Sequence, residues 1–572
     1  MGRYNLLEEQ WIPLMRNDGE VEKSSIIHLF QHASEYRGLA GDMATQNFSL
    51  LRLLLAIVLT VYSRVDAEGN PYPWLTLDGN EGDKLSITKP VTKHHAREYE
   101  KALKKTWLDI WDKHAFSGTV IQYLSAWKDY FFLYDDARPF FQIGKEDWMY
   151  FRNKDIYGKG AVDVQKGEKK LSLRKMNRLV SESNHKAAMF SPLIESEKDS
   201  MSDDAFARWL IMYQAYAGRM DKATFSQGTT SKGWLFEIGG IYLEGDSLFE
   251  TLLLNSTLPF VSDSVQHPCW EIKTRDYVEE RIDNRQIKDL AALYTNWSAT
   301  IYNENTKTEG ELQNVWVVKF PKIDATNFFL EPMTVFEEKK PNCYTPRSLK
   351  MEEAMWRSFG MIAESISNKS IRTRKPEIIR FYDALPDRVH KRTIMLCAVG
   401  MHPKDETSAI PYDEISDVLY FNPILLLDTE DDGWTRHIKD AVEDTKQAVE
   451  KYYERFLYHV SLHRNLQNSK KKNKKEQKTF TSKGVAALYE VIDQPFRIWL
   501  SNIVPEESKE DQIHQWKKIL RKLVLESANR LMARATTHDF ALIAKEDAKG
   551  NLGKPFNIVT AYNWLKRDLS KI

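Results

Sequence analysis

The spacing of apolar residues changes near residue 430 of this 572-residue chain. Before that point, short β-rich runs, aromatic clusters and helical segments alternate with frequent turns. Beyond it, apolar residues recur at steps of three and four, which is the period of an amphipathic helix. We therefore predict an α+β protein with a large mixed α/β domain over residues 1–430 and a C-terminal four-helix bundle over residues 431–572.

Two long helices dominate the predicted bundle. The apolar positions of the first are Ile438, Val442, Thr445, Val449, Tyr452, Phe456 and Val460. Those of the second are Trp516, Leu520, Leu523, Ala528, Leu531 and Ala535. Shorter helical stretches over about 485–500 and 557–569 complete the set, for which an antiparallel bundle is the simplest packing. The lysine-rich run 469–478 is predicted to be a solvated connector.

The N-terminal residues predict a hairpin anchored by a buried tryptophan. Trp11 and Ile12 form an apolar pair, and Pro13 keeps the chain extended. The Asp-Gly step at 18–19 supplies the positive φ of a tight turn. A second short apolar run follows at 25–27.

Composition indicates an ordinary globular protein, with 42% hydrophobic residues. Glu8 and Glu9 lie where a secretory signal needs an apolar run. The most apolar stretch, 50–62, is interrupted by Arg52 and is too short to cross a bilayer, so we predict a buried helix there. The cysteines, 269, 343 and 397, are too far apart to suggest a disulfide framework or a zinc motif. We expect a cytoplasmic protein with no membrane association, no metal and no cofactor.

The net charge restricts how the chain can bind nucleic acid. Lysine plus arginine and aspartate plus glutamate both number 81, so the formal charge is zero. Proteins that hold nucleic acid alone usually carry a basic excess. The chain therefore either ignores nucleic acid or contacts it through small local patches while partners hold the bulk. Composition leaves both alternatives open.

Several segments resemble the CasA family, the large subunit of type I-E CRISPR Cascade surveillance complexes. In chain order they are residues 5–13 (NLLEEQWIP), 39–57 (LAGDMATQNFSLLRLLLAI), 131–142 (FFLYDDARPFFQ), 242–255 (YLEGDSLFETLLLN) and 267–297, which begins HPCWE. They spread over most of residues 1–430, whereas the C-terminal part agrees only in length and helix count. The resemblance implies a subunit without catalytic residues, cofactor or small-molecule substrate.

The family's role follows from the same resemblance. Its members work with a guide RNA and the other Cascade subunits, read the protospacer-adjacent motif in double-stranded DNA, help to open the duplex and dock the helicase–nuclease. Because guide pairing reads the sequence, little affinity need come from this chain. The motif is read from the minor groove, whose code is degenerate, by a glycine loop, a lysine finger and a polar wedge.

Two of the motif-reading elements can be placed in this sequence. The glycine loop follows a predicted helix that ends in aromatic residues, and the lysine finger lies in a β-rich run. The glycine loop corresponds to Ala217, Gly218, Arg219 and Met220. Glycine there lets backbone amides approach the groove floor, although Gly218 would serve equally as a helix C-cap. The lysine finger corresponds to Lys319 or Lys322, whose ammonium can reach an acceptor on a base edge. The alternative for each lysine is an ordinary solvated side chain.

The wedge and a guide-RNA loop map less closely. The wedge corresponds to Asp405, Glu406, Thr407 and Ser408. The family's glutamine is missing there, and hydroxyls offset the cost of unstacking bases less well than an amide. The loop that meets the guide RNA and the backbone corresponds to Asn184, His185, Lys186 and Phe190. His185 and Lys186 would contact phosphate and Phe190 would stack on a base, unless this is an ordinary surface loop.

Two further features allow other interpretations. One helix carries a basic set that we expect on its outer face, as DNA-strand contacts or as a solvated surface: Lys517, Lys518, Arg521 and Lys522. If neither this set nor the loops touch DNA, the chain is a scaffold that bridges proteins. His538-Asp539 is similar to the HD signature of metal-dependent nucleases, but only His459 and His463 accompany it, and such chemistry needs several convergent ligands. No Walker loop or nucleophile elbow is present, so we predict no catalysis.

Overall fold

The computed structural model describes residues 3–79, 81–152, 170–179, 194, 198, 201–218, 225, 232–304, 314–366, 372–390, 393–403, 411–464, 471–544 and 553–572. The chain divides into two compact units. The first comprises Met1–Lys350, Ser367–Ala384 and Leu396–Asp417, and the second Met351–Ile366, Leu385–Met395 and Val418–Ile572. The second unit thus begins before the predicted boundary at 430 and takes in two short earlier segments, which no sequence period marks.

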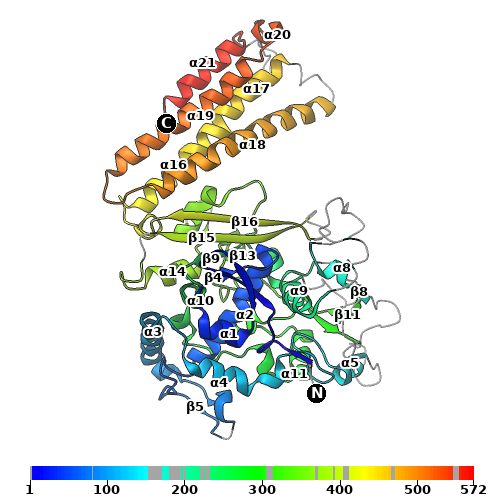
Figure 1. Ribbon diagram of the computed structural model, residues 1–572. Helices are drawn as coiled ribbons and strands as arrows, with labels where there is room; N and C mark the ends of the chain where they lie inside the picture. The colour runs from blue at the N-terminus through cyan, green and yellow to red at the C-terminus, as the bar shows by residue number, and fades with distance from the viewer. Residues whose placement is uncertain are drawn as a thin grey trace. The chain divides into compact units, whose positions relative to one another are not determined.

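Small sheets account for the strands of the structure, so the mixed helix-and-sheet class is confirmed (Figure 1). Four have their central strand between two neighbours: β3 (Val21–Ser24), β2 (Ile12–Arg16) and β4 (Tyr36–Leu39); β10 (Ala299–Tyr302), β11 (Asn314–Lys319) and β8 (Lys170–Ser172); β13 (Cys343–Pro346), β12 (Phe336–Lys340) and β14 (Thr373–Arg374); β16 (Pro411–Phe421), β15 (Ile394–Pro403) and β9 (Gly240–Glu244). Two are pairs: β1 (Arg3–Asn5) with β7 (Phe132–Tyr134), and β5 (Thr76–Leu77) with β6 (Ile87–Lys89).

The first unit also contains α-helices and short 3₁₀ turns. They are α1 (Ile26–His32), α2 (Ala44–Tyr62), α3 (Ala96–Lys113), α4 (Gly118–Ala126), α5 (Lys145–Arg152), α8 (Leu173–Met176), α9 (Asp203–Tyr216), α10 (Leu248–Ser256), α11 (Thr274–Ile282), α12 (Leu290–Tyr294) and α14 (Glu377–Asp383). Short 3₁₀ turns are η1 (Gly82–Lys84), η2 (Lys93–His95), η3 (Lys128–Tyr130), η5 (Trp234–Glu237), η6 (Leu258–Val261) and η7 (Cys269–Glu271).

The N-terminal hairpin is confirmed. Strands β2 and β3 pair antiparallel, and Gly19 takes the positive φ of 89° at their turn. Trp11 is fully buried, and its indole nitrogen donates to the carbonyl of Leu6 at 2.8 Å. The apolar run at 25–27 is helical, because Ser25 caps α1 by accepting from the backbone nitrogen of His28.

Helix α2 lies at the core of the first unit and contacts α9, α10 and α12. It contains no glycine or proline, and all its residues from Thr45 to Tyr62 except Asn47 are buried. Among the described residues it is the one helix long and apolar enough to cross a membrane, but 89% of that window is buried inside the protein. The predicted buried helix over 50–62 is thus confirmed, and it is longer than the apolar run.

A buried ion pair ties α2 to the rest of the unit. The guanidinium of Arg52 makes two 2.8 Å contacts with the carboxylate of Glu331, and the two side chains are 2% and 0% exposed. The same carboxylate accepts from the indole nitrogen of Trp234 at 2.6 Å. The ring of Tyr294 lies 4.2 Å from the guanidinium carbon. Each charged group therefore has protein partners in place of the water from which it is buried.

The second unit consists mainly of long helices that run beside one another (Figure 1). They are α16 (Trp434–Lys446), a π-helical turn (Gln447–Tyr453), α17 (Glu454–His463), α18 (Lys471–Ser501), α19 (Lys509–Met532) and α21 (Ile558–Leu569). Shorter elements are η8 (Met355–Ser358), α13 (Phe359–Ala363), α15 (Ile424–Leu427) and α20 (Thr537–Phe540). All seven apolar positions predicted for the first long helix are buried.

Two details of the helical prediction are wrong. The lysine-rich run is helical from residue 471, where α18 begins; the amide of Gln477 in this run is buried and donates to Ser461 at 2.7 Å. Lysine is a good helix former, and a pattern of charge alone does not distinguish a solvated loop from a solvated helix face. In α19 the buried residue is Val524 rather than Leu523, Leu531 is not buried, and the helix ends at Met532, before Ala535. Its buried stripe therefore advances in steps of four from Trp516 to Ala528.

Loss of the Arg52 charge should destabilise the protein strongly. Arg52→Met would leave the buried carboxylate of Glu331 without a counter-ion, which costs about 3–5 kcal/mol. Arg285→Met removes a guanidinium whose side chain is 63% exposed and should cost no more than ~1 kcal/mol. Urea unfolding of both variants measures the difference. Equal losses would contradict the central role of the pair.

Asp289 should make stability depend on pH. It caps α12 by accepting from the backbone nitrogen of Ala292 at 2.8 Å, and burial raises its pKa from 3.8 to about 6. The folded state therefore binds this proton more tightly than the unfolded state, and the stabilisation is complete below pH 3.8 and lost as pH rises through about 6. Asp289→Asn keeps the acceptor, and the difference in melting temperature between it and the parent should change across this window. A constant difference would contradict the assignment.

Candidate nucleic-acid interface

The predicted glycine loop leaves the end of α9 and returns to its own starting point. The backbone nitrogen of Gly233 donates to the carbonyl of Ala217 at 2.8 Å, so the two ends of the segment are joined. A Cβ on Gly233 would lie 2.2 Å from the carbonyl oxygen of Ala215, and only glycine allows this approach. Gly233, which the sequence mapping did not select, is therefore the glycine that closes the stem of the loop. Arg219 and Met220 lie outside the described residues.

Lys319 is bound to this stem through its side chain. Its side chain is fully buried at the end of β11, and its ammonium donates to the carbonyl of Gly218 at 2.8 Å. The ring of Tyr213 lies 5.4 Å from the same nitrogen. In addition, the carbonyl of Lys319 accepts from the backbone nitrogen of Phe225 at 3.2 Å. Contact of Lys319 with DNA stays a prediction, but in this conformation its ammonium is committed to the loop stem rather than extended toward solvent.

Of the two candidate lysines, Lys322 has the more accessible ammonium. Its side chain is 39% exposed, and its nitrogen lies 3.0 Å from the carboxylate of Glu237. Lys232, just before Gly233, pairs with the other oxygen of that carboxylate. Burial opposes ionisation of Glu237, but the hydrogen bonds from Lys232 and Lys322 outweigh it and hold the pKa of this carboxyl below its ordinary value. The result is a charged cluster with an ammonium able to exchange its partner for another acceptor.

A cavity of about 370 Å³ lies beside these residues. We call it the lysine cavity. Its lining includes Lys232 and Gly233 from the loop stem, Lys322, and Met401 and Pro403 from the end of β15. Pro403 is the last described residue before the predicted wedge, so three elements that lie far apart in the sequence lead into one hollow. The wedge residues Asp405, Glu406, Thr407 and Ser408 themselves lie outside the described residues, as do Asn184, His185, Lys186 and Phe190 of the predicted guide-RNA loop.

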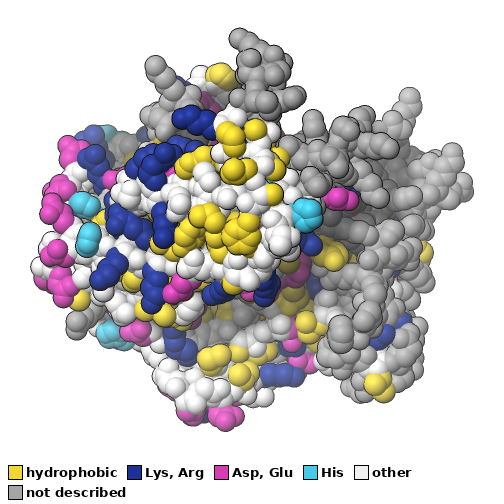
Figure 2. Space-filling view, turned by 90° about the horizontal axis from the view of Figure 1, so that it is seen from above, with side chains coloured by type: hydrophobic (Ala, Val, Ile, Leu, Met, Phe, Trp, Pro, Cys, Tyr) yellow, Lys and Arg dark blue, Asp and Glu magenta, His cyan; other side chains and the backbone are white. Residues whose placement is uncertain are grey.

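The basic set on α19 divides into two pairs. Lys517 lies 2.9 Å from Asp444 of α16 and is 27% exposed, and the Nε of Arg521 donates to the carbonyl of Leu569 at 3.1 Å. Only Lys518 and Lys522 are exposed. The expectation that all four face outward is wrong, because the helix is in contact with α16 as well as α21. Viewed toward α20 and α21, the molecule shows lysine and arginine side chains interspersed with apolar ones rather than a continuous basic stripe (Figure 2).

The His-Asp dipeptide has a structural role. Asp539 is buried, completes a capping box with Thr536 at the start of α20, and lies 3.4 Å from the Nε of Arg464. Its carboxylate is thus occupied by backbone and guanidinium donors. Within the described part of the chain, no three His, Cys, Asp or Glu side chains are arranged to hold a metal ion.

Solved structures of low sequence identity share the fold over the full chain. Thermobifida fusca Cse1 has 20% identity and a TM-score of 0.73, with 100% of this chain and 98% of that one covered. Thermus thermophilus CasA (Cse1) has 16% identity and a TM-score of 0.67, with both chains fully covered. A chain of a CRISPR RNA-guided surveillance complex has 12% identity and a TM-score of 0.58, with 99% of each covered. No curated protein sequence matches the chain.

The sequence itself matches a family model described as CRISPR-associated protein Cse1, over residues 5–527. That span contains every segment on which the resemblance to CasA was based, together with the loop stem and the lysine cavity. Because the match extends over far more than half of the sequence, and the fold agrees along the whole chain, this protein belongs to the CRISPR-associated Cse1 (CasA) family.

Proposed function

We propose that this chain is the large subunit of an RNA-guided antiviral surveillance complex of type I-E. In this role it reads the protospacer-adjacent motif in double-stranded DNA, helps to destabilise the duplex for R-loop formation and recruits the helicase–nuclease. The single observation that carries the proposal is the lysine cavity, which is lined by the loop stem, by Lys322 and by Pro403, the last described residue before the wedge. Family membership supplies the partners: a guide RNA and the other Cascade subunits.

Motif reading would depend on Lys322 more than on Lys319. An ammonium at the mouth of the cavity can leave Glu237 and donate to an acceptor on a minor-groove base edge, where A·T and G·C pairs differ. Lys319 would act as a positioning residue, because its bond to Gly218 holds the loop stem in place. The close packing of Gly233 against Ala215 serves the same end, since a displaced stem would move the backbone amides of the loop.

The subunit is proposed to be non-catalytic and cytoplasmic. The His-Asp pair that suggested a nuclease is used as a helix cap, and the DNA is cut by the recruited helicase–nuclease. The C-terminal helices, as a four-helix bundle, would hold a displaced strand or an adjoining subunit. The alternative is a protein scaffold without direct DNA reading. Zero net charge and the internal contacts of Lys517 and Arg521 favour that alternative for the bundle.

Lys322→Ala should weaken binding of the assembled complex to duplex targets that carry the correct motif. The expected loss is about 10- to 150-fold, because a hydrogen bond from a charged group is worth roughly 1.5–3 kcal/mol. Binding to pre-opened targets should change far less, since guide pairing supplies the energy there. Gel-shift titration measures the affinity for both targets and so gives the two losses separately. Lys339→Ala, which removes a 56% exposed lysine outside the cavity, is the matched control. Equal losses on both targets would mean that Lys322 serves assembly.

Paired substitutions on α19 should separate strand binding from structure. Lys518→Ser with Lys522→Ser removes the exposed pair; if it holds DNA, the salt dependence of open-complex binding should flatten by up to ~0.7–0.9 log units for each lost phosphate contact. Lys517→Ser with Arg521→Ser should instead lower the melting temperature, because these residues contact other helices. A salt slope and open-complex lifetime unchanged in the exposed-pair variant would favour the scaffold alternative.

A further inference from the structure

The carboxylate of Glu237 is shared by two lysines that come from different parts of the proposed motif-reading site. Its Oε1 accepts from the ammonium of Lys232, which directly precedes Gly233 of the loop stem. Its Oε2 lies 3.0 Å from the ammonium of Lys322. Among the described residues this carboxylate makes no other hydrogen bond or ion pair. Each oxygen therefore holds one lysine.

The backbone that carries Glu237 is fixed on both sides. Glu237 ends η5, whose first residue, Trp234, donates from its indole nitrogen to the carboxylate of Glu331 at 2.6 Å. Two residues after Glu237, the backbone nitrogen of Gly239 donates to the carbonyl of Arg347 at 2.9 Å. The carboxylate thus has a set position, whereas each lysine ends a flexible four-carbon stem.

The two lysines are not held equally. The side chain of Lys232 is 12% exposed, and its nitrogen also lies 5.4 Å from the centre of the Phe236 ring. The side chain of Lys322 is 39% exposed and that of Glu237 is 33% exposed. An ion pair that water reaches is weak, because the solvent screens it. Lys322 is therefore the partner that can leave, and Lys232 then keeps the charge of Glu237 paired.

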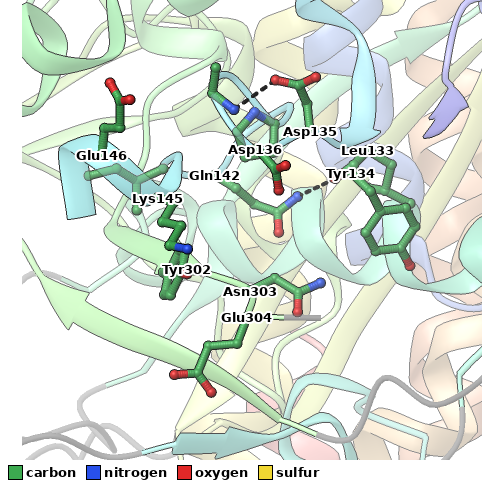
Figure 3. Close-up of a pocket in the computed structure, with 13 residues that line it drawn as sticks. Leu133, Tyr134, Asp135, Asp136, Gln142, Lys145, Glu146, Tyr302, Asn303 and Glu304 are labelled. Carbon is green, nitrogen blue, oxygen red and sulfur yellow. Dashed lines mark hydrogen bonds between the residues drawn. The ribbon is translucent and has the colours of Figure 1, made fainter. Parts of the chain in front are cut away.

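A second cavity of the first unit, of about 460 Å³ beside the loop that follows β7, shows the opposite arrangement (Figure 3). There the carboxylate of Asp135 accepts from the backbone nitrogens of Ala137 and Arg138, and the amide nitrogen of Gln142 donates to the carbonyl of Leu133 at 2.8 Å. Backbone groups are fixed by the fold, so rotation of a partner side chain cannot release these contacts. The pair of Glu237 with Lys322 joins two side chains and can open without movement of the backbone.

We propose that Glu237 is an internal competitor for Lys322: it occupies the ammonium in the free protein, and an acceptor on a base edge of the DNA has to displace it. The inference rests on the proposed function and adds to it a residue that lowers affinity. Only the molecules whose ammonium is free are ready to bind, so the apparent dissociation constant rises by the reciprocal of their fraction. Glu237 thereby weakens every duplex contact that needs Lys322, and guide pairing supplies the energy that retains a matching target.

Glu237→Gln tests the competition, because an amide has one acceptor oxygen where the carboxylate has two. That oxygen can keep Lys232, which leaves the ammonium of Lys322 free. The assembled complex with this variant should bind duplex targets that carry the correct motif about two- to fivefold more tightly, the range expected for loss of a partly exposed ion pair. Binding to pre-opened targets should stay unchanged. Gel-shift titration measures both affinities.

Two controls separate competition from a general loss of negative charge. Asp324→Asn removes an exposed carboxylate two residues from Lys322; this carboxylate accepts from the backbone nitrogen of Thr326 at 2.9 Å and makes no ion pair with a described residue. It should give a clearly smaller gain than Glu237→Gln. The second control introduces Glu237→Gln together with Lys322→Ala, and no gain is expected there because the ammonium is absent. Melting curves verify that each variant is folded.

Weaker duplex binding by Glu237→Gln would overturn the proposal and make Glu237 a positioning residue for Lys322; unchanged binding would overturn it as well. A gain that persists in the Lys322→Ala background, or that Asp324→Asn equals, would overturn it in favour of general electrostatics. Failure of the proposed function has a different signature: Lys322→Ala alone would leave duplex binding unchanged, and Glu237 would then have no DNA contact with which to compete.

Discussion

The structure of the first unit depends on the buried ion pair between Arg52 and Glu331. A guanidinium in the middle of an almost wholly apolar helix is unfavourable unless a carboxylate of matching geometry meets it. Glu331 does so with two contacts of 2.8 Å, and its carboxylate also accepts from the indole of Trp234 and the backbone nitrogen of Met333. Since Trp234 directly follows Gly233, the carboxylate that pairs with the core helix also binds the residue next to the end of the glycine-loop stem. A stability requirement and a candidate site are thus joined through one carboxylate.

Buried polar cross-links of the same kind recur in the segments that characterise the family. Arg64 contacts Glu271 of the HPCWE segment at 2.7 and 2.8 Å, and Tyr123 donates to the same carboxylate. Asn255 bridges both backbone groups of Leu243. These side chains face the interior, so the family segments act mainly as internal connectors.

The charges of this protein balance over the whole chain but not within its individual cavities. A zero sum of charges conceals one cavity with two lysines on a shared glutamate and another with four carboxylates around a buried amide. Under the proposed function, the first would exchange its internal ion pair for a contact with DNA.

Local order was predictable from the sequence, because it follows from turn chemistry and period. The Asp-Gly hairpin, the buried helix around Arg52 and the seven buried positions from Ile438 to Val460 needed no tertiary information. Only the tertiary structure decided the surroundings of Lys319 and Lys322, three residues apart: one is fully buried against Gly218, 101 positions away in the chain, and the other lines a cavity. It likewise placed Gly233 in close contact with Ala215 and gave the partly exposed Lys517 and Arg521 partners on other helices. In each case the contact is made with a segment far away in the chain. Residue type and spacing do not indicate which distant segment a residue will contact.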